Sequence, residues 1–237
     1  MSVLFFYSIF NNMKIIFIDT ETTGLSSQKH DIIQIAGLVT EDNKILDEFN
    51  FKCQPINWNT ISKQALQINN TTIEDLKSYE MPQATFIHFL KTLERHFNGE
   101  KFIIAGQNIK AFDWRFVVTF WENHKRYADP DFQFYFDNRK SLDLLDLSRP
   151  LKKYGFLDVP NVKLGTIVEA LNIKVEGELH DALADIKATQ QGFYGLVEKV
   201  NAIRKSNPTH PLFDNQKLID TMELFWDTAP PKVHAVF

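Results

Sequence analysis

Apolar and polar residues follow two different periods along this chain, and these periods predict its strands and helices. An unbroken apolar run from Ile15 to Ile18 predicts a strand at Lys14–Asp19 that is buried on both faces. Runs rich in β-branched and aromatic residues, bounded by turn residues, predict four more strands, at Asp31–Thr40, Lys44–Lys52, Lys101–Gly106 and Ser141–Leu145. Apolar spacings of three and four residues predict helices at Pro82–Phe97, Phe112–His124, Val162–Leu171, Ala182–Val200 and Asn215–Phe225.

The order of these elements indicates the fold class. Three strands come first, and helix–strand–helix–strand–helix–helix follows, which predicts a mixed α/β sheet of five strands flanked by helices. In open α/β sheets the functional site lies at the ends of the strands. The stretch from Asn123 to Asn138 is expected to be a surface insertion.

The chain divides into three predicted regions. Residues 13–200 are expected to form one domain, with an N-terminal appendage at 1–12 and a C-terminal tail at 201–237 that holds one helix. The apolar run in 1–12 is too short to span a bilayer and lacks the basic region of a signal peptide. Met13 directly precedes the first strand, so this segment is interpreted as an appendage or as the result of a start codon assigned too early.

Composition and charge restrict the possible functions. The 237 residues are 44% apolar and 24% charged, as in ordinary globular proteins, and carry a net charge of −4. This charge gives no global attraction to nucleic acid, so any such binding must depend on local basic patches and on metal ions. The single cysteine, Cys53, excludes an intramolecular disulfide and favours a reducing, cytoplasmic location.

The end of the first predicted strand carries two acidic residues. Asp19 and Glu21 are two positions apart, so on a strand their side chains project from the same face. Two carboxylates this close repel each other, and a bound cation relieves the repulsion. An all-oxygen site of this kind suits Mg²⁺ or Mn²⁺. The alternative is a strand that runs into a polar turn, with Gly24 supplying the bend.

Two further carboxylates lie at predicted helix starts. Asp113 follows the strand at Lys101–Gly106, and Asp185 lies at the start of the long helix near the C-terminus. A carboxylate in a first helical turn is also stabilised by the helix dipole, so each of them taken alone is compatible with a capping role.

Taken together, these residues resemble the DEDDh family of 3′–5′ exonucleases, which includes the proofreading (epsilon) subunits of bacterial DNA polymerase III. The first family motif, D-x-E-T-T-G, is matched at 19–24. The second, an Asn followed by an Asp, is matched by Asn108 and Asp113, and the third, H-x-A-x-x-D, is matched at 180–185. Three motifs in the family's order are far more specific than any one of them. The resemblance covers approximately Met13 to Lys199 and leaves the tail outside.

The resemblance implies an RNase H-like fold and a two-metal phosphodiesterase. It implies that Asp19, Glu21 and Asp185 bind one divalent cation, Mg²⁺ or Mn²⁺, and that Asp19 bridges to a second. Asp113 would act on the second cation through water. His180 would be the general base, because an imidazole takes up a proton near neutral pH.

Substrate contacts are also implied by the resemblance. The backbone near Thr22 would contact the terminal sugar, and Leu25 would pack against the terminal base. Leu25 as a core residue is an equal alternative, and Asn108 would either hydrogen-bond the substrate or fix its own loop. A site for unpaired ends favours single-stranded or frayed 3′ termini, because bases in a duplex must first be unstacked.

The chain also departs from the family pattern. Gln107 stands where a His commonly precedes the second-motif Asn, and Asn69-Asn70 replace the His-Gly of a loop that many relatives carry. Asn tolerates the left-handed backbone region that Gly prefers, so the turn at Asn70 is expected to survive.

Three functional classes follow from the sequence. The leading one is a 3′–5′ exonuclease acting on DNA, with nucleic acid 3′ ends as its partner; an exoribonuclease and a non-catalytic nucleic-acid-binding module are the alternatives. A polymerase or a sliding clamp is a further candidate partner, since Thr221–Phe225 loosely resembles a clamp-binding peptide. The favoured interpretation of that peptide is an apolar helix face docked on its own domain. No membrane partner is expected.

Overall fold

Five strands form one mixed sheet in the order β3-β2-β1-β4-β5. The computed structural model describes residues 14–41, 43–128, 131–174 and 182–226. The strands are β1 (Lys14–Thr22), β2 (Ile32–Glu41), β3 (Lys44–Lys52), β4 (Phe102–Gly106) and β5 (Phe136–Asp143). β1, β2 and β3 pair antiparallel, whereas β4 pairs parallel with both β1 and β5. The predicted sheet of three antiparallel and two parallel strands is therefore confirmed.

Nine α-helices and four short 3₁₀ turns are present in the described part of the chain. The α-helices are α1 (Lys63–Ile68), α2 (Ile73–Ser78), α3 (Pro82–His96), α4 (Asp113–His124), α5 (Phe132–Tyr135), α6 (Leu144–Lys153), α7 (Leu164–Ala170), α8 (Ala182–Ser206) and α9 (Gln216–Met222). All five predicted helices are present; four agree with their expected bounds within three residues, whereas α8 extends six residues beyond the expected end at Val200. Within the described ranges, no helix combines the length and the hydrophobicity that crossing a bilayer requires.

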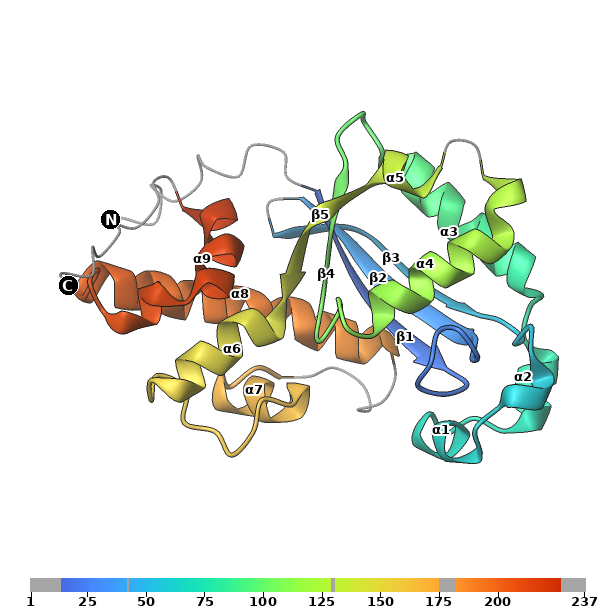
Figure 1. The fold of residues 1–237 in the computed structure, drawn as a ribbon, viewed down its shortest axis with the longest axis horizontal. Helices are drawn as coiled ribbons and strands as arrows, with labels where there is room; N and C mark the ends of the chain where they lie inside the picture. Colours follow the sequence, from blue (N-terminus) through green and yellow to red (C-terminus); the bar gives the residue numbers. More distant parts are fainter. Residues whose placement is uncertain (1–13, 42, 129–130, 175–181, 227–237) are drawn as a thin grey trace.

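The sheet lies between two layers of helices because the side chains of β1 alternate between its faces. Ile15 and Phe17 belong to a core shared with α6, α7, α8 and the segment that contains α9. Ile16 and Ile18 face the opposite core, which α3 and α4 cover. Figure 1 shows α3 and α4 on one side of the sheet, with α6 and the long α8 on the other. Because β1 is central and buried on both faces, its end lies between the two helix layers.

The prediction of a surface insertion at Asn123–Asn138 is wrong. This stretch contains α5 and the start of β5, and Phe132, Tyr135 and Phe136 are buried in it. The ring centroids of Trp121 and Phe132 lie 5.1 Å apart. Aromatic side chains bury large areas, and their clustering places this aromatic-rich stretch in the core.

The last predicted strand is displaced along the chain. β5 begins at Phe136 and ends at Asp143, so Leu144 and Leu145 of the predicted strand belong to the unpredicted helix α6. Asp143 caps this helix, since its carboxylate accepts a hydrogen bond from the Leu145 backbone N–H at 3.0 Å. The cap ends the strand and starts the helix at the same residue.

The segment after α8 packs on the domain. Met222 is fully buried, and the Phe225 ring lies 5.6 Å from that of Phe193 on α8. The docked-helix interpretation of Thr221–Phe225 is confirmed, because a clamp-binding peptide would need these apolar side chains accessible. The expected appendage at 1–12 lies outside the described residues.

Gly37 on β2 is predicted to tolerate no side chain. A Cβ at this position would lie 2.5 Å from the Phe17 carbonyl oxygen and 2.4 Å from the Phe49 ring. Gly37→Ala is expected to lower the free energy of unfolding by about 1–3 kcal/mol, the usual cost of overpacking a core. Urea denaturation followed by circular dichroism measures this change.

Gly192 on α8 provides the matched control. A Cβ there would make only ordinary contacts, with Val168 Cγ1 nearest at 3.7 Å. Gly192→Ala is expected to leave stability unchanged or to raise it by up to about 1 kcal/mol, because Ala favours helix. Equal effects of the two substitutions would contradict the close packing at Gly37.

Candidate active site

The carboxyl end of β1 brings the first two candidate residues together. Asp19 and Glu21 follow the buried part of the strand, opposite Ala36 and Gln34 of β2. Both side chains keep part of their surface exposed, and the register shifts after Glu21. The strand therefore delivers two carboxylates from the core to an accessible edge of the sheet.

Asp113 is held against the same strand end by hydrogen bonds. It is the first residue of α4, it is buried, and its Oδ1 accepts bonds from both the backbone N–H (3.0 Å) and the hydroxyl (2.7 Å) of Thr20. Thr20 lies between Asp19 and Glu21, so these two bonds fix the α4 carboxylate beside the β1 pair. The role of Thr20 was not predicted from the sequence, because a Thr inside the motif carries no charge that would point to it.

The fourth carboxylate, Asp185, comes from the first turn of α8. α8 packs directly on β1, and the negative charge of Asp185 contributes to raising the pKa of Asp19. Burial is the largest cause of that rise, followed by the charges of Asp113, Glu21 and Asp185. Three elements that are distant in the sequence thus place their carboxylates within electrostatic reach of Asp19.

Asp113 is also hard to ionise in the folded protein. Burial raises its pKa to about 7, although the hydrogen bonds from Thr20 act in the opposite direction. A nearby cation stabilises the ionised form of a buried carboxyl that has negative neighbours, and it therefore lowers the pKa of that carboxyl again.

The donor set fits a hard divalent cation. All four groups are carboxylates, the ligands that Mg²⁺ and Mn²⁺ prefer, and the only cysteine, Cys53, is buried elsewhere, with its thiol on the Ile32 carbonyl. As they stand, the described residues include no group of three or more His, Cys, Asp or Glu side chains gathered closely enough to enclose a metal ion. Like charges repel, so a tighter arrangement requires a countercharge.

Asp143 supports the site and was not singled out from the sequence. Its Oδ1 accepts a bond from the Asn108 backbone N–H at 2.8 Å, and its charge adds to the rise in the pKa of Asp113. Asn108 has a φ of 58°, which asparagine tolerates better than most residues. Asp143 is the last residue of β5, whereas the sequence placed it in the middle of a strand predicted at Ser141–Leu145, so its position at the strand end could not be anticipated.

Asn108 and Gln107 therefore have distinct roles in the loop before α4. The backbone of Asn108 is fixed by Asp143, while its side chain is exposed. Gln107, in place of the family's His, donates from Nε2 to the Val162 carbonyl at 2.8 Å and ties this loop to the segment before α7.

The rim beside the first motif is built from Thr22, Asn69 and Asn70. The Thr22 hydroxyl donates to the Gly24 carbonyl at 2.8 Å, and the Asn69 side-chain amide donates to the Thr22 carbonyl at 3.0 Å. Asn70 has a φ of 45°, so the expected survival of the turn is confirmed. Asn69, which replaces the family's His, is bound to the first motif.

Leu25 is 87% exposed. The core alternative for Leu25 is therefore wrong, and an apolar side chain projects from the rim next to the carboxylates. His180, in contrast, lies outside the described residues, and so does Asp181.

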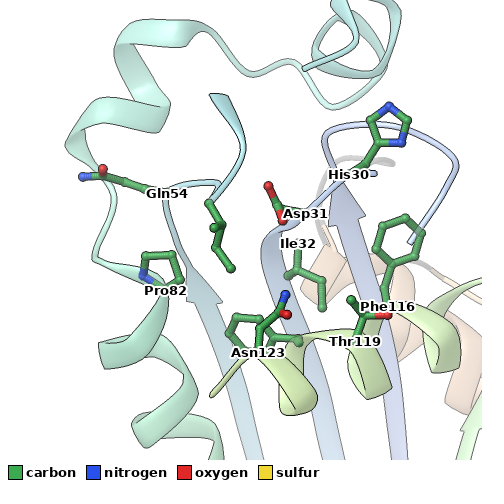
Figure 2. Close-up of a pocket in the computed structure, with 10 residues that line it drawn as sticks. His30, Asp31, Ile32, Gln54, Pro82, Phe116, Thr119 and Asn123 are labelled. Atoms are coloured by element: carbon green, nitrogen blue, oxygen red, sulfur yellow. The ribbon is translucent and has the colours of Figure 1, made fainter. Parts of the chain in front are cut away.

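A small cavity of about 10 Å³ lies between the start of β2 and α4. Figure 2 shows Thr119 and Asn123 of α4 projecting toward Asp31 and Ile32. Asp31 accepts bonds from the backbone N–H (2.7 Å) and the side-chain amide (3.2 Å) of Asn57. This volume is suited to a single water molecule, so the cavity is excluded as a nucleotide site.

Comparison with known proteins agrees with the motifs. The model of the RNase T exonuclease family matches residues 16–193. The chain is 30% identical over 196 residues to a PolC-type DNA polymerase III of Thermotoga petrophila, covering 83% of this chain and 13% of the relative. It is 28% identical over 195 residues to the 3′–5′ exonuclease DinG of Bacillus subtilis, covering 81% and 18%.

The fold is that of a solved exonuclease structure. E. coli exonuclease I in complex with a dA16 oligonucleotide superposes with a TM-score of 0.63 and 20% identity, covering 85% of this chain and 42% of that one. The chain thus spans less than a fifth of the curated relatives above.

The raised pKa of Asp113 predicts a pH dependence of stability. Between its ordinary pKa of 3.8 and its folded pKa of about 7, the native state binds more protons than the unfolded state. The free energy of unfolding is therefore expected to fall as pH rises through this range in EDTA. Asp113→Asn should remove part of that fall, measured by urea denaturation at pH 5 and pH 7.5.

The control for this prediction is Asp158→Asn, which neutralises an exposed carboxylate. It should leave the pH dependence as in the wild type. An unchanged dependence in Asp113→Asn would show that Asp113 ionises normally in the fold.

Proposed function

The chain belongs to the RNase T family of exonucleases, whose DEDD-type members act in the 3′–5′ direction, and from this membership we propose a metal-dependent 3′–5′ exonuclease of DNA. The product would be nucleoside 5′-monophosphates, released one at a time from the 3′ end. The observation that supports the proposal is the arrangement at the end of β1, where Thr20 holds Asp113 beside the Asp19–Glu21 segment and the adjoining α8 carries Asp185 in its first turn. The charges of Asp113, Glu21 and Asp185 all contribute to the raised pKa of Asp19.

The four carboxylates would hold two divalent cations, Mg²⁺ or Mn²⁺. Asp19, Glu21 and Asp185 are the proposed ligands of the first, with Asp19 shared and Asp113 acting on the second through water. When bound, such a pair stabilises the charge that develops on the attacking and leaving oxygens of a phosphodiester. The hydrogen bonds from Thr20 would keep Asp113 in place while this charge changes.

His180 is proposed as the general base. It would take the proton from the water that attacks the terminal phosphorus, and the bond from phosphorus to the 3′ oxygen of the preceding nucleotide would break. The leaving oxygen takes up a proton from solvent, so the balance is one water consumed for each monophosphate released. An imidazole suits this role because its ordinary pKa lies near the working pH.

The rim beside the carboxylates would bind the 3′-terminal nucleotide. Exposed Leu25 supports an apolar contact with the terminal base, and Thr22, whose carbonyl is held by Asn69, would border the sugar. A terminal base bound in this way must leave its stack, which favours single-stranded or frayed ends. Association with a DNA polymerase is proposed on the PolC-type relatives alone.

Asp19→Asn is predicted to abolish hydrolysis. The substitution removes the proposed shared ligand, and EDTA should have the same effect on the wild type, because both leave the phosphodiester without charge stabilisation. The measurement is the laddering of 5′-labelled single-stranded DNA with Mg²⁺ or Mn²⁺, with RNA of the same sequence alongside.

Asp158→Asn, at an exposed site, serves as the control and should degrade DNA at the wild-type rate. Faster laddering of RNA than of DNA would identify an exoribonuclease instead. Hydrolysis that persists in EDTA or in Asp19→Asn would refute the metal-dependent mechanism.

His180→Ala is predicted to lower the rate on the order of 10²-fold or more, because the attacking water loses its base. Cation binding, measured by calorimetry, should stay at the wild-type level, since no metal contact is lost. His88→Ala is the matched control, as His88 is exposed on α3. Near-normal turnover of His180→Ala at neutral pH would exclude the assignment.

A further inference from the structure

Two adjoining depressions lie next to the candidate site, on the side of β5 and α6. One, of about 610 Å³, lies between the loop before α4, β5, α6 and α9. The other, of about 430 Å³, lies between the same loop, α6 and the segment before α7. Asn108 and Arg149 line both of them, so the two depressions form one continuous groove.

Five cations line this groove: Lys110, Lys140, Arg149, Lys163 and Lys217. They come from the loop before α4, from β5, from α6, from the start of α7 and from α9. Within the described part of the chain, none of the five forms an ion pair with a carboxylate. Such a concentration is notable in a chain with a net charge of −4.

The lining also contains four acidic residues, two of which accept hydrogen bonds from neutral groups of the protein. Asp143 accepts the backbone N–H groups of Asn108 and Leu145, and Asp220 accepts the side-chain amide of Gln216 at 2.6 Å. Asp146 and Glu223 are the others. The five cations of the groove therefore exceed its four acids by one, and the cations are the residues that reach from five different segments.

The groove is connected to the candidate site through the loop before α4. Asn108 belongs to the loop that leads into Asp113, and Asp143 joins the loop to the end of β5. The hydroxyl oxygen of Ser141 in the groove wall is buried and has no hydrogen-bond partner in the described structure. The wall also offers several exposed cations to a ligand that extends away from the carboxylates.

We propose that this groove binds the phosphate backbone of the single strand upstream of the nucleotide being removed. The inference rests on the proposed function and extends it from the terminal nucleotide to the rest of the strand. A polyanion matches a groove lined by exposed cations from several elements, and contacts of cations with phosphates need no sequence preference. The groove would hold the strand while the 3′ end of the strand lies at the carboxylates. Long substrates would therefore be bound more tightly than short ones.

The test is a triple variant, Lys110→Gln, Arg149→Gln and Lys217→Gln, compared with a matched triple of exposed lysines away from the groove. The control is Lys77→Gln, Lys91→Gln and Lys101→Gln, which removes the same net charge. Binding of 5′-fluorescein-labelled dT20 is measured by anisotropy in EDTA over a range of salt concentrations. The kcat/KM for dT20 relative to dT2 is measured with Mg²⁺.

The groove variant should bind dT20 more weakly than the control, on the order of tenfold at moderate salt. Its plot of log affinity against log salt should be flatter by about 2, since each lost contact with a single strand removes about 0.7 from the slope. The ratio of kcat/KM for dT20 over dT2 should fall in the groove variant and stay at the wild-type value in the control. Single variants, each expected to flatten the slope by about 0.7, replace the triple variant if its thermal melting shows misfolding.

Equal salt slopes in the two triple variants would overturn the proposal. So would weaker inhibition by dTMP with an unchanged dT20 to dT2 ratio, which would assign the groove to the released monophosphate. If no protein hydrolyses either substrate but the salt slope of the groove variant still falls, the proposed exonuclease function fails while the groove stands.

Discussion

The mutual repulsion of carboxylates at the end of a buried strand is the constraint on which the rest of this structure depends. Burial raises the pKa of Asp19, and so do the negative charges of Asp113, Glu21 and Asp185. Such an arrangement lowers the stability of the fold, because buried ionised groups lose hydration and repel one another. The arrangement persists only because rigid elements on both faces of the sheet hold the charges in place.

Those elements hold the carboxylates by packing and by hydrogen bonds to the backbone. β1 is central, α8 packs on one of its faces, and α4 lies on the other. Thr20 fixes Asp113 at the strand end, and Asp143 fixes the loop that leads into α4. Each carboxylate therefore lies on a strand or at the start of a helix, and such elements fix a side chain more precisely than a flexible loop does.

The distribution of charge differs sharply from the net charge. A chain of −4 overall concentrates acids at the end of β1 and exposed cations along the neighbouring groove. Local fields of this kind decide where an anionic polymer is bound, because screening limits each charge to about 10 Å in ordinary salt. Negative and positive regions side by side suit a ligand that is held along its backbone and approached by metal ions at one end.

The sequence by itself determined the sheet, its five strands and five of the nine helices of the described chain, and it predicted the four carboxylates as candidate site residues, because periodicity and short motifs are local. It did not determine that Phe132 and Tyr135 pack on Trp121 in the core, because the charged and turn-forming residues around them suggested a surface insertion. Only the tertiary structure placed Thr20 against Asp113, Asp143 against Asn108, and α9 beside the loop before α4. Asn108 and Asp143 are 35 positions apart in the sequence, and Thr20 and Asp113 are 93 positions apart. No local pattern encodes such pairs, because the packing of helices on both faces of one sheet brings them together.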